Sequence, residues 1–298
     1  MKKIVVFIVG PTAVGKTDVA VRLAQHYLTE VISADSRQFY KEMLIGTARP
    51  TPLQMQGVPH HLVGHISVQQ PYDVADFEKD ALSIIEQILQ KKNIVLVVGG
   101  SGLYLKTLAE GIDQIPKVDW HVRHQILQKY QQEGLTSLLE ELSERDAVYF
   151  QQVDKANPQR IIRALEVCRA TGKPYSTFRT GKKVIRPFDI LKIGLILPRE
   201  ELYFRINRRV EQMVAAGLQE EALSLIKYRD VNALQTVGYR EIFEWYDGKY
   251  SWQECIKRIQ QNTRHFAKRQ LTWFRKDTSI QWFAPQEIAN IISWIDRF

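Results

Sequence analysis

Cysteine is scarce in this chain, and its placement excludes two kinds of site. The 298 residues include two cysteines, Cys168 and Cys255, which lie far apart. Distant thiols argue against a disulfide framework or a cysteine-based metal site and are typical of a reducing compartment. We expect each thiol to be a small buried residue. His60, His61 and His65 share a Pro/Gly-rich loop without cysteine, so we interpret them as packing or hydrogen-bonding residues rather than zinc ligands.

Long apolar runs are also missing. No stretch has the roughly 20 consecutive apolar residues that a membrane-spanning helix needs, and no signal-peptide pattern precedes the first predicted strand. Internal repeats and low-complexity tracts are absent from the sequence. We therefore expect a cytoplasmic protein that has no membrane contact. We separately expect it to act as a monomer.

Acidic residues are fewer than basic ones. The chain has 33 Asp and Glu against 41 Lys and Arg, which gives a formal net charge of +8. This balance favours a polyanionic partner such as nucleic acid, although many metabolic enzymes share it. The positive charge is concentrated in residues 199–209 and 257–276, and both segments also carry aromatic side chains.

The most specific motif lies near the amino end. Apolar residues 4–9 run into the pattern GxxxxGKT, and a helical pattern follows. This is the context of a phosphate-binding loop, whose backbone N–H groups and helix N-terminus face an anion. Lys16 adds a positive charge, and the Thr17 hydroxyl can ligate Mg²⁺. The predicted site for a di- or triphosphate comprises Gly10, Pro11, Thr12, Ala13, Val14, Gly15, Lys16 and Thr17.

Alternating strand and helix patterns predict an α/β fold: a doubly wound parallel sheet around the phosphate-binding loop. Between 118 and 172 the periodicity is helical only, which predicts an all-helical inserted subdomain at 116–185 within a core of 1–115 plus 186–298. We expect the core to finish in helices that run to about 276. The expected strands are 3–9, 31–34, 94–98 and 190–197, with helices at 16–28 and 74–91 and an extended loop region at 46–73.

Polar residues follow the predicted strands at the sheet edge that binds ligands in this fold class. Asp35 comes directly after the second strand, where a carboxylate can ligate Mg²⁺ through water or accept a proton from a nucleophile. A turn or helix-capping aspartate is the alternative. Ser36, Arg37 and Gln38 follow Asp35 and could contact the same substrate.

The strand at 94–98 ends in Gly99-Gly100-Ser101. Loops that hydrolyse ATP usually pair with a strand that ends in a metal-binding Asp. This ending therefore weakens an ATPase or motor interpretation. Ser101 instead offers a hydroxyl near the phosphates, unless it simply caps the next helix.

The inserted region contains a cationic helix start. Asn157-Pro158 marks the beginning of a helix, and Arg160 and Arg163 project to one side of it. Cations are unfavourable near a helix N-terminus, so their placement suggests an anionic ligand or RNA phosphates. An ion-paired or solvated face is the alternative. Arg123, in the first helix of this region, is a weaker candidate from the sequence alone.

The C-terminal segment 262–276 is basic and has interleaved aromatic residues. On a helix its basic side chains lie along one side, and its aromatic side chains can anchor others. The basic residues are Arg264, Lys268 and Arg275, and the aromatic ones are Phe266, Trp273 and Phe274. Such a strip can hold a phosphate backbone and stack on unpaired bases; a basic surface helix docked by its aromatics is the alternative.

The residues alone leave several functions open. A small-molecule or nucleoside kinase shares the loop, the carboxylate after the second strand and an Arg-bearing helical lid, but it does not explain the basic aromatic C-terminus. A non-catalytic RNA-binding protein that uses nucleotide as a switch does not explain Asp35 at the ligand edge.

Motifs over nearly the whole chain make it similar to the tRNA dimethylallyltransferase family, which prenylates the adenosine beside the anticodon. Ser101 stands where many members have Thr, which keeps the hydroxyl. The C-terminal zinc finger of eukaryotic relatives has no counterpart in this sequence, which suggests the bacterial form. The matching segments are 10–17, 33–40, 45–50, 59–61, 72–77, 98–104, 157–160, 163–166, 237–240, 263–264 and 267–273.

This resemblance implies the reaction and its partners. Dimethylallyl diphosphate is the donor, the N6 amine of an adenosine in the anticodon stem-loop of tRNA is the acceptor, diphosphate leaves, and Mg²⁺ is the cofactor. The implied catalytic residues are Asp35, Thr17, Ser101 and Arg123. With the basic C-terminal strip, the predicted tRNA contacts are Asp35, Ser36, Arg37, Gln38, Gln159, Arg160, Ile161, Ile162, Arg163, Arg240, Arg264, Lys268 and Arg269.

Overall fold

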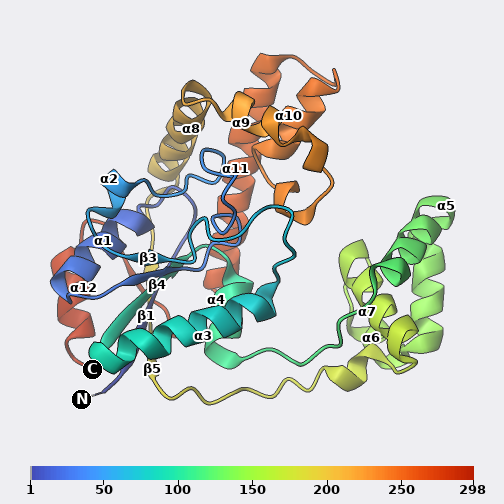
Figure 1. The fold of residues 1–298 in the computed structure, drawn as a ribbon, viewed down its shortest axis with the longest axis horizontal. Coiled ribbons are helices and arrows are strands. Elements are labelled where there is room, and N and C mark those ends of the chain that lie inside the picture. Colours follow the sequence, from blue (N-terminus) through green and yellow to red (C-terminus); the bar gives the residue numbers. More distant parts are fainter. Residues whose placement is uncertain (1) are drawn as a thin grey trace. The chain divides into compact units, whose positions relative to one another are not determined.

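The structure, a computed structural model, describes residues 2–298 and divides into two units. The first comprises the chain up to Glu110 together with Ile185–Phe298, and the second is Gly111–Val184 (Figure 1). The sequence-based boundaries, 115/116 and 185/186, lie a few residues from these.

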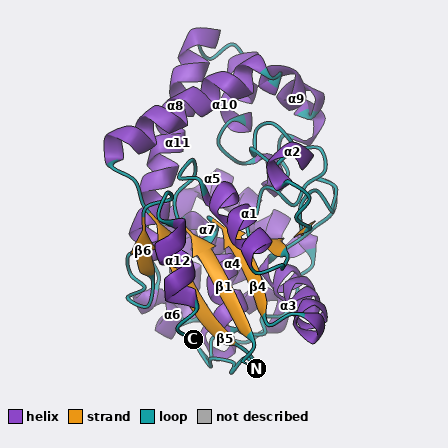
Figure 2. Ribbon diagram, turned by 90° about the vertical axis from the view of Figure 1, so that its left-hand side faces the viewer, coloured by secondary structure: helices purple, strands orange, loops and turns teal. Residues whose placement is uncertain are grey.

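A parallel sheet forms the centre of the first unit (Figure 2). In register, Val9 at the end of one central strand lies opposite Gly99 of one neighbour and Gly194 of the other. Every neighbouring pair is parallel, which confirms the predicted fold class. The strand order is β3 (His60–His61), β2 (Val31–Ser33), β4 (Ile94–Gly99), β1 (Ile4–Val9), β5 (Asp189–Leu195) and β6 (Gln281–Phe283).

Two cores cover the two faces of this sheet. All six residues of β1 are buried, and they alternate between the cores. A continuous apolar strand is therefore what this position requires. Helices α3 (Val74–Lys91) and α4 (Gly102–Glu110) pack into the core on one face, and α1 (Lys16–His26) and α12 (Ile288–Ile295) into the core on the other.

Four further helices of this unit lie beyond the carboxyl ends of the strands, as the ribbons show (Figures 1 and 2). They are α8 (Arg199–Ala215), α9 (Leu218–Ser224), α10 (Tyr239–Tyr246) and α11 (Trp252–Phe274), accompanied by short 3₁₀ turns at Ile226–Tyr228 and Asn232–Leu234. Parallel sheets bind ligands at these strand ends, so α8 to α11 face the edge at which a site is expected.

Within residues 111–184 the second unit contains helices and no strand, as predicted. Its elements are α5 (Trp120–Arg145), α6 (Ala147–Gln152), α7 (Pro158–Thr171) and a 3₁₀ turn at Tyr175–Phe178. The predicted start of α7 is confirmed, because the Asn157 side chain accepts a hydrogen bond from the backbone N–H of Arg160. Helix α5 is kinked at Gly134, where φ is 79°.

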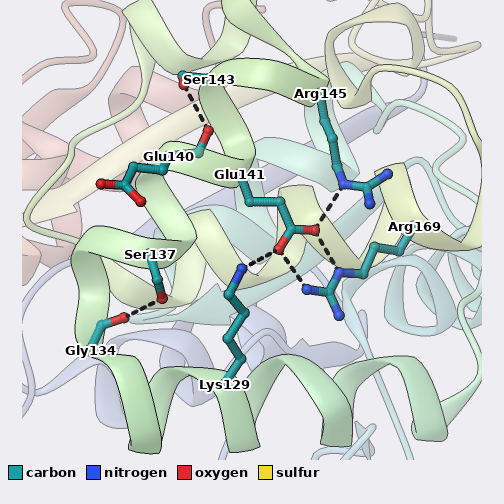
Figure 3. A network of polar contacts seen from close by, with 8 residues as sticks. All are labelled: Lys129, Gly134, Ser137, Glu140, Glu141, Ser143, Arg145 and Arg169. Carbon is teal, nitrogen blue, oxygen red and sulfur yellow. Dashed lines mark hydrogen bonds and ion pairs between the residues drawn. The ribbon is translucent and has the colours of Figure 1, made fainter.

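A carboxylate links two helices of the second unit. Glu141 accepts hydrogen bonds from Lys129 at 3.1 Å and from Arg145 and Arg169 at 2.8 and 2.5 Å (Figure 3). The Arg169 guanidinium, helped by Lys129 and Arg145 against the effect of burial, lowers the pKa of Glu141 to about 2. The group therefore links α5 to α7 as a carboxylate at neutral pH.

The structure departs from the sequence-based expectations in two places. The region 46–73 contains helix α2 (Pro52–Met55) and strand β3, and the chain continues after α11 with β6 and α12 rather than finishing in helices near 276. These elements are too short for a clear periodic signal. Both cysteines are buried free thiols, as expected. Within residues 2–298, no helix combines the length and apolar character needed to cross a membrane.

Candidate active site

The phosphate-binding loop connects β1 to α1. Gly10 and Gly15 have φ angles of 147° and 105°, and a Cβ on Gly10 would lie 2.7 Å from the carbonyl oxygen of Leu195. Glycine is therefore required for this path. Because α1 begins at Lys16, the unsatisfied N–H groups and positive end of the helix are directed into the loop, where they can bind an anion.

Lys16 lies across this loop. Its ammonium donates hydrogen bonds to the carbonyl oxygens of Gly10 at 3.0 Å and Pro11 at 2.8 Å. Burial lowers the pKa of Lys16 to about 8, while the Asp35 carboxylate opposes this shift and the Arg209 guanidinium adds to it. Lys16 is thus still mainly a cation at neutral pH, within the electrostatic reach of one carboxylate and one guanidinium.

Asp35 and Ser101 follow neighbouring strands, because β2 pairs with β4 and Ser33 lies opposite Val98. The Ser101 hydroxyl accepts a hydrogen bond from the backbone N–H of Ser36 at 3.1 Å and lies 3.2 Å from the Ser36 hydroxyl. The Asp35 carboxylate accepts one from the N–H of Arg37 at 3.0 Å. The two strand ends therefore form one polar edge.

This edge lines a cavity of about 560 Å³ in the first unit. The cavity also reaches the phosphate-binding loop at Thr12, helix α8, the start of α10, and one face of α11. It brings together residues predicted separately for catalysis, donor binding and RNA binding. These are Thr12, Asp35, Ser36, Arg37, Ser101, Arg240 and Arg269.

Two further residues in the cavity wall were not singled out from the sequence. Arg209, on α8, has its pKa lowered by burial, with the Asp35 carboxylate opposing that shift. Gln270, on α11, accepts a hydrogen bond from the backbone N–H of Thr12 at 2.8 Å. In the sequence, Arg209 belongs to the basic segment 199–209 and Gln270 to the matching motif 267–273. Neither pattern shows which side chain faces the cavity.

Helix α11 presents aromatic side chains to the cavity. Phe266 and Trp273 line it and are 40% and 44% exposed, whereas Phe274 is buried in the core. Of the three aromatics expected to anchor this helix, Phe274 does so. The exposed rings of Phe266 and Trp273 are available instead to stack on a flat ligand.

Arg269 faces a different side of α11 from Lys268 and Arg275, which share a side as predicted. Arg269 lines the main cavity. Lys268 lines a separate cavity of about 270 Å³ together with Arg199 and Arg275. The Arg264 guanidinium donates to the Asn207 side chain of α8 at 2.7 Å. The tRNA contacts predicted for Arg264 and Lys268 stay predictions, and their side chains lie outside the main cavity.

Arg37 and Gln38 stabilise the loop that follows Asp35. The Arg37 guanidinium donates to the carbonyl oxygen of Asn232 at 2.7 Å, and the Gln38 amide donates to those of Thr47 and Ala48 at 3.2 and 3.3 Å. The amide of Gln38 is therefore hydrogen-bonded within the protein. Arg37, by contrast, also lines the cavity.

A carboxylate from α9 supports the cavity wall at residues 46–48. Glu221 accepts hydrogen bonds from the backbone N–H groups of Leu44, Ile45 and Gly46 at 2.7–2.9 Å, and from the Tyr239 hydroxyl at 2.6 Å. The Tyr239 ring is fully buried, and a Cβ on Gly46 would lie 2.5 Å from it. This wall is therefore closely packed.

In the second unit, a buried carboxylate orients two of the predicted arginines. Glu166 is 3% exposed and accepts hydrogen bonds from Arg123 at 2.5 Å and Arg163 at 3.1 Å. These arginines are therefore ion-paired within their own unit, which is the alternative that the sequence left open for Arg163.

Some side chains of the helix start at 159–163 are exposed, and others are buried. Gln159 and Arg160 are exposed on α7, whereas Ile161 and Ile162 are buried in the core of the helical unit. The side chains of Ile161 and Ile162 are thus not available for the predicted tRNA contact, because they are turned into that core. The tRNA contact predicted for this segment therefore remains a prediction for Gln159, Arg160 and Arg163.

The histidines of the loop have structural contacts. His61 Nε2 lies 2.6 Å from the Glu30 carboxylate, and His65 packs edge-on against Phe39. His60 Nδ1 lies 2.8 Å from the carbonyl oxygen of Val58. In the part of the chain that the structure describes, no group of three His, Cys, Asp or Glu residues could hold a metal ion.

The chain is similar to known proteins over most of its length. A family model for IPP transferases matches residues 38–277. The chain is 47% identical to tRNA dimethylallyltransferase 1 of Bacteroides fragilis, over 98% of this chain and 97% of the relative. A solved tRNA isopentenylpyrophosphate transferase from Bacillus halodurans is 37% identical, with a TM-score of 0.73 over 100% of this chain and 96% of that one.

A solved eukaryotic dimethylallyltransferase described as acting on tRNA is 28% identical, with a TM-score of 0.80 over 97% of this chain and 75% of that one. These similarities extend over nearly the full length of the chain, and the family model covers most of it. They agree with the resemblance that the sequence motifs indicate. The chain belongs to the IPP transferase family.

Proposed function

We propose that the chain transfers a dimethylallyl group from dimethylallyl diphosphate to the N6 amine of the adenosine beside the anticodon of tRNA and releases diphosphate. One observation carries this proposal: Thr12 of the phosphate-binding loop, the Asp35–Ser101 edge and the aromatic face of α11 line the same cavity. This cavity can therefore take up the donor diphosphate, and it is lined by a proton acceptor and by aromatic rings on which a base can stack.

The leaving group is the part of the donor that the loop stabilises. As the allylic C–O bond breaks, its electron pair stays with diphosphate, whose negative charge grows. The loop N–H groups and the cationic Lys16 stabilise this charge, and Arg209 in the cavity wall adds a second cation. These interactions strengthen in the transition state, so they accelerate the reaction rather than only bind the donor.

The acceptor needs a base. The N6 lone pair of adenine is delocalised into its ring, so the amine becomes acidic only as the new C–N bond forms. The Asp35 carboxylate then takes the N6 proton. The N–H of Arg37 holds Asp35, and the hydroxyl of Ser101 bonds to Ser36 beside it, which places both groups at the cavity.

We also propose Mg²⁺ as cofactor. The donor set fits, because Mg²⁺ takes few protein oxygens and completes its coordination with water and phosphate. The Thr17 hydroxyl at the start of α1 would hold it, with Asp35 acting through water. When bound, the ion would neutralise part of the diphosphate charge.

The RNA must present a single base. An adenosine in a folded loop is taken out of its stack before chemistry on its N6 is possible. Phe266 and Trp273 offer rings for stacking, and Arg240 and Arg269 lie at the same cavity to meet phosphates. We assign Gln159, Arg160 and Arg163 of the helical unit to the same RNA, while the catalytic role expected for Arg123 stays a prediction. We further propose that the protein acts as a monomer in the cytoplasm.

Mass spectrometry of tRNA nucleosides tests this function. The protein is incubated with unmodified tRNA, Mg²⁺ and dimethylallyl diphosphate, and a parallel reaction contains ATP labelled in its γ-phosphate. We expect N6-dimethylallyladenosine in the first reaction and no labelled product in the second. Transfer of the labelled phosphate, without prenylated adenosine, would instead identify a kinase.

A further inference from the structure

Gln270 joins the aromatic face of α11 to the phosphate-binding loop. Its side-chain oxygen accepts a hydrogen bond from the backbone N–H of Thr12 at 2.8 Å, and its side-chain nitrogen donates one to the carbonyl oxygen of Gly100 at 3.0 Å. One amide therefore links three segments: the loop after β1, the turn after β4, and α11. The two bonds also fix the orientation of the amide, since one needs an acceptor and the other a donor.

The surroundings hold this amide in place. Gln270 is 6% exposed, and a Cβ on Gly100 would lie 2.1 Å from its nitrogen. A buried amide with both hydrogen bonds made is costly to disturb, because either partner would be left unsatisfied. A glutamine on a basic helix is therefore a part of the donor site rather than of the helix surface.

The linked segments are those whose spacing matters for the reaction. Thr12 belongs to the loop that binds diphosphate, and Gly100 precedes Ser101 at the polar edge with Asp35. On α11, Gln270 lies between the cavity-lining residues Phe266 and Trp273. The Gln270 amide thus sets the distance between the cradle of the leaving group and the edge that meets the acceptor.

We propose that Gln270 is a positioning residue for the donor: it fixes the phosphate-binding loop against the β4 turn and α11, so that the bound diphosphate is aligned for departure. This inference rests on the proposed function, because the aligned ligand is the donor of that reaction. It does not require a direct contact of Gln270 with the donor, and its effect is on donor affinity and turnover rather than on RNA affinity.

The test compares three variants of the full chain. Gln270→Leu removes both hydrogen bonds, and Gln270→Glu keeps an acceptor for Thr12 while losing the donor to Gly100 and adding negative charge near the diphosphate. Gln261→Leu, at an exposed position of the same helix, is the matched control. For each variant kcat, the KM values of donor and tRNA, the Kd of inorganic diphosphate by calorimetry, and the Tm are measured.

We expect Gln270→Leu to raise the donor KM and the diphosphate Kd about tenfold and to lower kcat, with the tRNA KM within twofold of wild type. The effect of Gln270→Glu on diphosphate should be larger. Unchanged diphosphate binding in both variants would overturn the inference, as would equal rises in both KM values. If the wild type makes no prenylated tRNA, the proposed function fails; the calorimetry still tests Gln270 separately.

Discussion

At the scale of single residues, the site depends on three charges in close proximity. Lys16, Asp35 and Arg209 affect one another electrostatically. Burial lowers the pKa of both cations, and the Asp35 carboxylate opposes that shift. A leaving diphosphate needs the cations and an attacking amine needs the carboxylate, so the same arrangement serves both partners of the transfer.

Replacing Asp35 with asparagine removes the base but keeps its size. We expect kcat to fall about 10²–10⁴-fold, because proton transfer from N6 loses its acceptor, while the KM for tRNA stays within a few-fold. Single-turnover kinetics measure this effect, with Asp230→Asn, at an exposed site, as control. Turnover of Asp35→Asn near the wild-type rate would remove the base from the mechanism.

The buried Lys16 predicts a pH dependence. With its pKa lowered to about 8, Lys16 in the free enzyme loses its charge as pH rises through that value, so kcat/KM for the donor should fall on the alkaline side. Lys16→Arg should be less active at pH 7 but lack this fall, because the guanidinium stays charged. A wild-type profile that is flat from pH 7 to pH 9 contradicts the assignment.

At the scale of elements, the apolar side chains of α11 face two different environments. Its inward side is divided between the core, where Phe274 packs, and the cavity, where Phe266 and Trp273 remain about half exposed. Exposed apolar side chains that are grouped and rimmed by polar residues are typical of an interaction site. We therefore expect a flat ligand to stack on this side of α11.

Trp273→Ala should weaken RNA binding. Stacking of a base on an aromatic ring is worth about 1–3 kcal/mol, so the KM for tRNA should rise roughly 5- to 160-fold while the Kd of inorganic diphosphate stays unchanged. Phe204→Ala, an exposed ring on α8 outside both cavities, is the control. Equal effects of the two variants would argue against stacking at Trp273.

The wall at residues 46–48 predicts a stability effect. Glu221→Ala leaves three backbone N–H groups and a buried phenol without their acceptor, which should lower the free energy of unfolding by about 2–3 kcal/mol. Urea unfolding measures this loss, with the exposed Glu220→Ala on the same helix as control. A loss for Glu221→Ala no larger than the control would show that the wall does not depend on this carboxylate.

The elements that sequence predicts well are those with long, clean patterns. Helix α3 and strand β4 are found within a residue of their expected bounds, because an 18-residue amphipathic stretch and the five consecutive apolar residues 94–98 each fit one type of element. The edge strand β6 and the two-turn α12 carry too few residues to show a period. Arg209 and Gln270 were missed because the sequence pattern of a polar residue on a helix is the same whether its side chain faces water or a buried site.

At the scale of the whole molecule, the chain consists of two units whose cores are separate. The first holds the phosphate-binding loop and the cavity, and the second holds its own core of α5, α6 and α7 together with the Glu141 and Glu166 ion pairs. Each unit is stabilised by interactions within it, so a change in one should leave the local stability of the other nearly intact.

Glu141→Gln tests this separation. The folded pKa of Glu141, about 2, lies below its ordinary value of 4.5, so its stabilising effect is present above pH 4.5 and is lost as pH falls toward 2. Hydrogen exchange should therefore accelerate in α5 and α7 at pH 7, and less so at pH 3, while β1 and α1 stay protected. The exposed Glu140→Gln is the control; acceleration in both units alike would contradict the prediction.

The central claim is that the loop after β1 holds a leaving diphosphate rather than a nucleotide that is consumed. The most direct measurement quantifies inorganic diphosphate and prenylated adenosine in one reaction of protein, tRNA, Mg²⁺ and dimethylallyl diphosphate without ATP. The account predicts the two products in equal amounts, and both lost in Lys16→Ala. Prenylation that requires ATP, or diphosphate release without prenylated tRNA, would contradict it.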